Sequence, residues 1–198
     1  MWPFSRRVPI QQQLARLAAA GIAVNAGVTA EDLTAFASVD GIERSPYREL
    51  VTVLATAIER EPFTPKCDRL WLCDFECIED HGSYRDVVAR LERMTERALR
   101  LDSIEDRVEI EEGVAWVAFR HAGRRVQWDM RVDDDWLDPS ILPRYDALLA
   151  DAGVGFRLFA DAGDHGQCAL LGAFRPDEKR AFDAFARMRM VPVAECRM

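Results

Sequence analysis

The residues from Arg125 to Val132 alternate between polar and apolar side chains, which limits the possible folds more than any other feature. The apolar members are Val126, Trp128, Met130 and Val132. A strand with this pattern belongs to a sheet with one buried face and one solvated face. Two further strand patterns, Arg107–Glu111 and Val114–Arg120, precede it after short turns. Short turns indicate antiparallel neighbours, so this region predicts an antiparallel sheet.

Strand and helix patterns alternate on both sides of this sheet. The other strands are expected at Leu70–Ile78, Gly155–Ala160 and Gln167–Phe174. The helices are expected at Ser83–Arg100, after Asp138-Pro139, and after Arg175-Pro176. The resulting order, β-α-β-β-β-α-β-β-α, predicts an α+β fold with helices packed on one face of a mainly antiparallel sheet.

The first part of the chain has helical patterns only. Its signals are the amphipathic stretch Gln11–Ala20, a capping box formed by Thr29 and Asp32, and a helix start at Ser45-Pro46. A segment containing two prolines follows, which indicates a linker. We therefore predict an N-terminal helical segment over residues 1–62 and an α+β sheet domain over residues 68–198.

The negative charge is concentrated in the middle of the chain. Residues 61–138 carry 20 acidic and 12 basic side chains, so this region alone holds the net charge of −8 that the whole chain has. Phosphate repulsion argues against nucleic acid as a partner here. The charge favours a basic protein partner, a bound cation, or a solvated surface. No apolar stretch is long enough for a membrane helix, so no membrane association is expected.

Two acidic clusters stand out in this region. The first contains Asp74 and Glu76, which fall on the same face of the expected strand, followed by Glu79, Asp80 and His81 in the loop before the next helix. The second is Asp133, Asp134 and Asp135, directly after the most regular strand. We treat these eight residues as a candidate binding surface.

Both clusters also have a purely structural interpretation. Acidic residues before a helix stabilise its N-terminus, and Ser83 with Asp86 forms a capping-box pattern there. The second cluster would be a turn in which Asp138 caps the next helix while Trp136 packs into the core.

The Asp74-x-Glu76 pattern on a strand resembles the first motif of the DEDD family of 3′–5′ exonucleases. That resemblance implies that Asp74 and Glu76 hold Mg²⁺ or Mn²⁺ for phosphodiester cleavage. The chain departs from the family pattern because neither His165 nor Tyr145 lies at the spacing of the final motif. The family also places three antiparallel strands before its first helix, and this chain does not.

The cysteine pattern does not predict a disulfide framework or a zinc site. The five cysteines are Cys67, Cys73, Cys77, Cys168 and Cys196, an odd number with irregular spacing. On one strand, Cys73 and Cys77 would lie roughly 13 Å apart, too far to share an ion. We expect small core residues with reduced thiols. A Cys–His nucleophile stays open, because such pairs form in space.

The composition and the clusters together favour a non-enzymatic cytoplasmic protein. Only two of the 26 basic residues are lysines, and alanines are abundant, which suggests a GC-rich bacterial genome. We expect an immunity- or adaptor-like module that binds a basic protein through its acidic surface and needs no cofactor. The alternative is a metal-dependent hydrolase, phosphodiesterase- or nuclease-like, that uses the clustered carboxylates.

Overall fold

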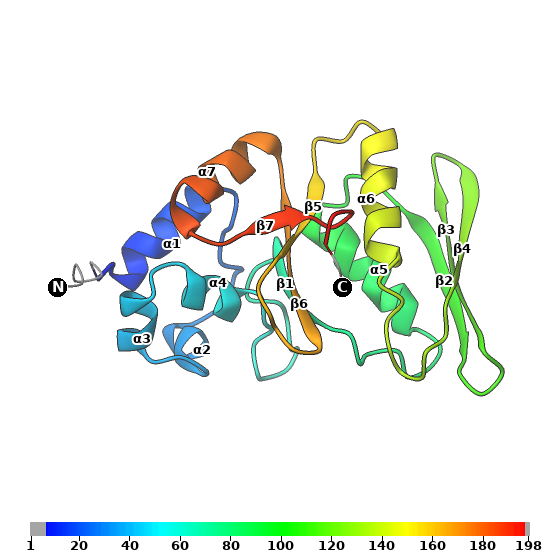
Figure 1. The fold of residues 1–198 in the computed structure, drawn as a ribbon, viewed down its shortest axis with the longest axis horizontal. Coiled ribbons are helices and arrows are strands. Elements are labelled where there is room, and N and C mark those ends of the chain that lie inside the picture. Colours follow the sequence, from blue (N-terminus) through cyan, green and yellow to red (C-terminus); the bar gives the residue numbers. More distant parts are fainter. Residues whose placement is uncertain (1–6, 197–198) are drawn as a thin grey trace.

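The computed structural model describes residues 7–196 and contains seven helices and seven strands (Figure 1). The helices are α1 (Ile10–Ala19), α2 (Ala30–Thr34), α3 (Val39–Arg44), α4 (Arg48–Leu54), α5 (Ser83–Met94), α6 (Ile141–Asp151) and α7 (Pro176–Ala186). The strands are β1 (Leu70–Asp74), β2 (Asp102–Glu109), β3 (Val114–His121), β4 (Arg124–Met130), β5 (Arg157–Asp161), β6 (Cys168–Phe174) and β7 (Met190–Pro192). None of the helices within residues 7–196 is long and apolar enough to cross a membrane.

A four-stranded antiparallel sheet in the order β1-β6-β5-β7 forms the middle layer of the molecule. Both of its faces are buried, as neighbouring residues of β6 illustrate. Leu170 packs with helices α1, α4 and α7, whereas Leu171 packs with α5 and α6 on the opposite face. The apolar run from Ala169 to Phe174 is typical of a strand covered on both faces.

The second sheet is the three-stranded meander β2-β3-β4. Val117 and Phe119 are buried against α5 and α6, while the other face is solvated and carries an Arg125–Glu105 ion pair. Figure 1 shows α5 and α6 between the two sheets. The predicted alternation in β4 is confirmed, because Met130 is buried and Gln127 and Asp129 are exposed.

The α+β class with mainly antiparallel strands is confirmed. The strands divide into two sheets where we expected one, and helices cover one face of the three-stranded sheet but both faces of the four-stranded sheet. The division of the chain into 1–62 and 68–198 stays a prediction. In the structure, the N-terminal helices share a hydrophobic core with β1, β6 and α7.

Of two predicted helix starts, the structure confirms one and contradicts the other. The capping box is confirmed at α2, where the Thr29 hydroxyl accepts the Asp32 N–H and the Asp32 carboxylate accepts the Thr29 N–H. The predicted start at Ser45 was wrong: Ser45 ends α3, and α4 begins after Tyr47, which has a φ of 72°. The buried side chain of Gln13 accepts the Tyr47 N–H at 2.7 Å, so a residue from α1 holds this turn.

Candidate binding surface

The two acidic clusters, 74–81 and 133–135, are brought together by backbone pairing. Strand β1 ends at Asp74, earlier than predicted, and the chain after it runs beside the segment that follows β4. The Leu137 N–H donates to the Phe75 carbonyl at 2.7 Å, and the Ile78 N–H donates to the Asp135 carbonyl at 2.9 Å. Residues about 60 positions apart in the chain therefore form one surface, with Glu76 opposite Trp136.

Asp74 and Glu76 converge on one amide group. Gln167, which precedes β6, donates from its side-chain nitrogen to Asp74 at 3.0 Å and to Glu76 at 3.1 Å. The Asp74 carboxylate also accepts the Glu76 N–H at 3.0 Å. All three side chains are exposed, so this contact orients the two carboxylates while leaving them open to solvent.

Glu79 and Asp80 lie in the loop before α5, where the Ser83 hydroxyl accepts both of their N–H groups. Their own carboxylates are exposed and have no polar partner among residues 7–196. His81 turns toward β2 instead: its Nδ1 accepts the Val108 N–H at 3.2 Å, and its Nε2 lies 3.4 Å from Glu109.

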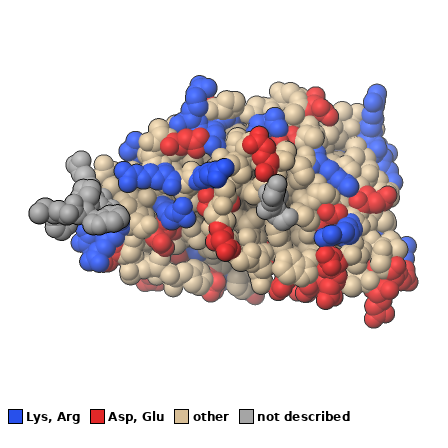
Figure 2. Space-filling view, viewed as in Figure 1, with Lys and Arg blue, Asp and Glu red and all other residues tan. Residues whose placement is uncertain are grey.

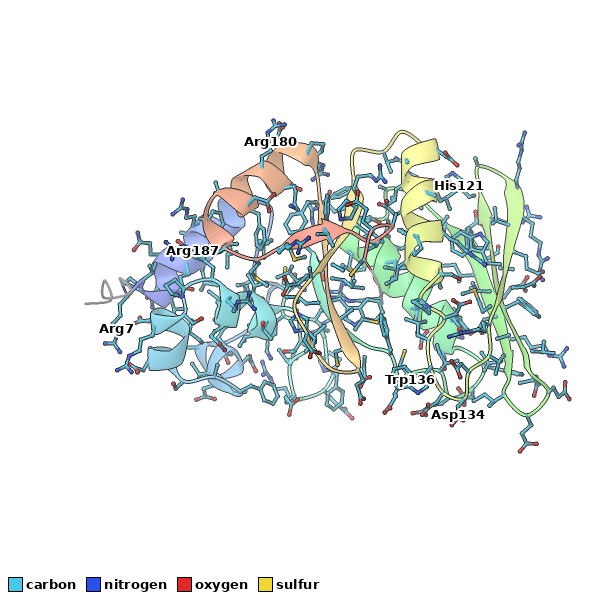
Figure 3. All side chains as sticks on the ribbon, in the orientation of Figure 1. Arg7, His121, Asp134, Trp136, Arg180 and Arg187 are labelled. Carbon is cyan, nitrogen blue, oxygen red and sulfur yellow. The ribbon has the colours of Figure 1, made fainter. Side chains whose placement is uncertain are left out.

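The second cluster contributes three carboxylates and an aromatic ring. Asp133 pairs with Arg131 at 3.0 Å, whereas the carboxylates of Asp134 and Asp135 have no polar partner within the described chain. Trp136 was expected to pack into the core, but 39% of its surface is exposed. Its backbone is held in the pairing with residue 76, and the ring lies on the same edge of the molecule as Asp134 (Figure 3).

The capping of α5 differs from the prediction. Gly82 precedes the helix with a φ of 107°, and Ser83 and Asp86 do not form a capping box. Instead, the Asp106 carboxylate of β2 accepts the Gly82 N–H at 2.8 Å and the Arg85 N–H at 3.1 Å. A carboxylate from another element therefore neutralises this helix end, which leaves the acidic loop 79–80 free of a capping role.

The thiols near this surface are poor nucleophiles. Burial raises the pKa of the Cys73 thiol, and the neighbouring Cys77 and Asp74 raise it further. Burial, with Asp74 and Asp135 next, raises the pKa of the Cys77 thiol to about 11. A nucleophilic cysteine needs a lowered pKa, so the surroundings of these thiols disfavour covalent catalysis. Cys73 and Cys77 were expected on one strand, but β1 ends at Asp74, so Cys77 lies outside it.

Metal ligands are not grouped in the described part of the chain. Within residues 7–196, no three His, Cys, Asp or Glu side chains are placed to hold one ion. The eight predicted residues instead divide into three settings: Asp74 with Glu76 at Gln167, His81 at β2, and the remaining acids in the two loops. We define the acidic surface as Asp74, Glu76, Glu79, Asp80, Asp133, Asp134, Asp135 and Trp136.

Charge is unevenly placed over the three-stranded sheet. In Figure 2 the carboxylates gather at the lower right, where Figure 1 shows the loop after β4 and the turn between β2 and β3. Arginines gather at the upper right, near the turn between β3 and β4 that carries Arg124. The sequence predicted an acidic middle third, and its carboxylates gather most densely at this lower end of the three-stranded sheet, although several are paired with arginines there, as Asp133 is with Arg131.

Searches of protein-family models, of curated proteins and of solved structures found no match to this chain.

Proposed function

We propose that this chain is a non-enzymatic binding protein, immunity- or adaptor-like, whose acidic surface receives a basic protein partner. The observation that carries the proposal is the pairing of residues 75–78 with 135–137, which joins two acidic segments around the exposed Trp136. A solvated face would need no such convergence, since scattered charges serve solubility equally well.

The charge of this surface is largely uncompensated. Glu79, Asp80, Asp134 and Asp135 have no polar side-chain partner among residues 7–196, and Arg131 is the basic residue paired with Asp133. Exposed charges of one sign attract an oppositely charged protein over several ångströms and speed its association. A basic partner would gain most from these unpaired carboxylates.

Trp136 supplies the other part of a binding surface. Tryptophan is among the residues that most often dominate the binding energy of an interface, because its large ring is removed from water while the residues at the rim of the interface stay polar. Here Trp136 is 39% exposed, and its backbone pairs with that of Glu76 where the two acidic segments meet. We expect the partner to present arginine or lysine side chains around an apolar or flat contact for this ring.

A capture experiment with matched variants tests this proposal. The full chain is tagged and incubated with lysate of its source cells, using wild type, Trp136→Ala and Asp134→Asn/Asp135→Asn. The control is Asp151→Asn/Glu195→Gln, which removes the same charge from exposed carboxylates elsewhere that also have no described polar partner. A basic protein should be captured by wild type and control, be lost from both test variants, and be released by high salt.

Affinity measured with the purified partner makes the test quantitative. Trp136→Ala should weaken binding by roughly thirtyfold, the factor expected for an interface hot spot. The double Asp variant should mainly slow association, by about tenfold at low salt. Equal binding by all four proteins, or binding that does not respond to salt, contradicts the proposal.

A metal-dependent hydrolase is the second candidate, because Asp74 and Glu76 converge on the Gln167 amide. Thermal unfolding with Mn²⁺, Mg²⁺ or Zn²⁺ tests it directly. A rise in Tm with one of these ions that disappears in Asp74→Ala supports the hydrolase. The control variant Asp151→Asn should show the same rise as wild type. An unchanged Tm with every ion contradicts it.

A further inference from the structure

A pocket of about 410 Å³ lies at the C-terminal end of α5, the opposite end of that helix from the acidic surface. This volume falls within the range of roughly 300–1,000 Å³ found for small-molecule sites. The pocket is lined by Ala89, Glu92, Arg97, Arg100, Leu101 and Ile104. These residues come from α5, from the turn that follows it and from β2, so both ends of the turn form the wall.

The turn holds its side chains at a conformational cost. Predicted to continue to Arg100, the helix stops at Met94, and Glu96, Arg97 and Arg100 have φ values of 55°, 54° and 52°. Residues other than glycine rarely adopt this left-handed conformation, and such residues cluster at functional sites. Backbone bonds from Arg97 to Glu92 and from Arg100 to Arg97 fix the turn and place both arginines on the pocket.

The two arginines of the pocket have no described partner. Glu96, between them and the helix, is already bound by Arg69 and Arg175. By contrast, the guanidinium groups of Arg97 and Arg100 make no hydrogen bond, ion pair or ring contact with residues 7–196. Both side chains are exposed, so two positive charges at the rim of the pocket are available to an anionic group.

Glu92 places a negative charge deeper in the same pocket. Its side chain is 5% exposed and accepts hydrogen bonds from the Tyr145 hydroxyl at 2.8 Å and the Leu101 N–H at 3.2 Å. No cation of the described chain lies within ion-pair distance of it. A buried carboxylate is usually paired with a cation, so this pocket favours a positive group near Glu92.

We propose that this pocket binds a small zwitterion with an apolar side chain, the class to which the free apolar α-amino acids belong. The carboxylate of the ligand lies between Arg97 and Arg100, its ammonium group faces Glu92, and its side chain packs on Leu101 and Ile104. Each charged group of the ligand then lies next to a side chain of opposite charge that has no ion-pair partner within residues 7–196. This site is separate from the acidic surface, so it does not depend on the function proposed above.

Calorimetric titration of the full chain tests the charge pattern of the ligand. The probes are leucine, methionine, phenylalanine and tryptophan at up to millimolar concentrations, followed by 3-phenylpropionate and 2-phenylethylamine. At least one amino acid should bind. For phenylalanine, loss of either charged group should weaken binding by about tenfold or more, since a hydrogen bond to a charged group contributes at least that factor. The absence of binding by all four amino acids overturns the proposal, as does equal binding of the analogue that lacks the amine.

Variants then assign the contacts. Arg97→Gln/Arg100→Gln should weaken amino-acid binding by about a hundredfold. Glu92→Gln removes the negative charge, while its one carboxamide oxygen can still accept the Leu101 N–H and its NH2 group can donate to the Tyr145 hydroxyl oxygen. This variant should reduce the binding of phenylalanine to the affinity of 3-phenylpropionate, which lacks the amine. Arg124→Gln is the matched control, because this exposed arginine also has no polar side-chain partner within residues 7–196. Equal loss in the control, or unchanged binding in the Arg97→Gln/Arg100→Gln variant, overturns the assignment; circular dichroism verifies that each variant is folded.

Discussion

The carboxylates of this protein fall into two groups that differ in what surrounds them. Glu96 and Glu178 lie where α5, α7 and the four-stranded sheet meet, and both are bound by Arg69 and Arg175. The carboxylates of the acidic surface are exposed except for the half-buried Asp135, and four of them have no polar partner within the described chain. The same residue types therefore hold the fold together in one region and remain available in the other.

The difference lies in the basic residues nearby. The side chain of Arg69 is 8% exposed and donates to the Ala173 carbonyl. Its guanidinium group lies over the Phe156 ring, and the guanidinium carbon of Arg175 lies 4.0 Å from the centre of the same ring. A buried guanidinium needs negative partners, so the carboxylates around it are required for stability. Among residues 7–196, the arginine that pairs with the acidic surface is Arg131, and it is exposed. The carboxylates of the acidic surface therefore do not neutralise a buried cation.

The largest effect is expected from Arg69→Met. It removes the cation between Glu96 and Glu178 and the bond to Ala173, and we expect a loss of about 3 kcal/mol in the free energy of unfolding. Urea denaturation followed by circular dichroism measures it. The control is Arg180→Met, which breaks an exposed pair with Asp177 and should cost less than about 1 kcal/mol. Similar losses in both variants would mean that the inner group has no special role.

Asp106→Ala should have the next largest effect. Its carboxylate caps α5 from β2, so the variant should lose about 1–2 kcal/mol in the free energy of unfolding. The matched control is Asp86→Ala, because Asp86 is the cap partner that the sequence predicted but that pairs with Arg85 instead. A larger loss in the control would contradict the capping by Asp106.

The pH dependence of stability should also differ between the two groups of carboxylates. The hydrogen bond from Arg175, followed by the charge of Arg69, lowers the pKa of Glu96 in the folded state. A lowered pKa means that the contribution of Glu96 is complete above the ordinary value of about 4.3 and is lost as the pH falls below it. We expect Glu96→Gln to flatten the stability profile between about pH 5 and pH 3. Urea titrations at each pH give the free energy of unfolding. If this free energy depends on pH in Glu96→Gln as steeply as in wild type, the prediction is contradicted.

The smallest effect is expected at the acidic surface. Asp134→Asn/Asp135→Asn should change the free energy of unfolding by less than about 0.5 kcal/mol, because neither carboxylate has a polar partner in the described chain. Thermal and urea unfolding measure it. A loss comparable to that of Arg69→Met would place these aspartates among the residues that hold the fold.

Local signals in the sequence were sufficient where the contact itself was local. The alternation of β4 fixed its buried face, and the capping box of α2 lies within four residues. Both patterns depend on a residue and its near neighbours, so they are readable without knowing the fold. The concentration of charge in residues 61–138 was likewise visible in the sequence.

Predictions were wrong where a distant residue took over a local role. Asp106 caps α5 in place of Ser83, and Gln13 holds the start of α4 in place of Ser45. Neither replacement has a local signal, because a single aspartate in a strand or glutamine in a helix is ordinary. Trp136 was misplaced for a related reason, since backbone pairing with residue 76 holds it at the surface.

The α+β class, the hairpins and the acidic middle third can be predicted from the amino-acid sequence, because periodicity, turn chemistry and charge are properties of neighbouring residues. Three features became visible in the folded chain alone: the strands form two sheets, residues 75–78 pair with 135–137, and Glu92 and two arginines line one pocket. These features depend on contacts between segments far apart in the chain, and such contacts form when each segment buries apolar surface that the other covers.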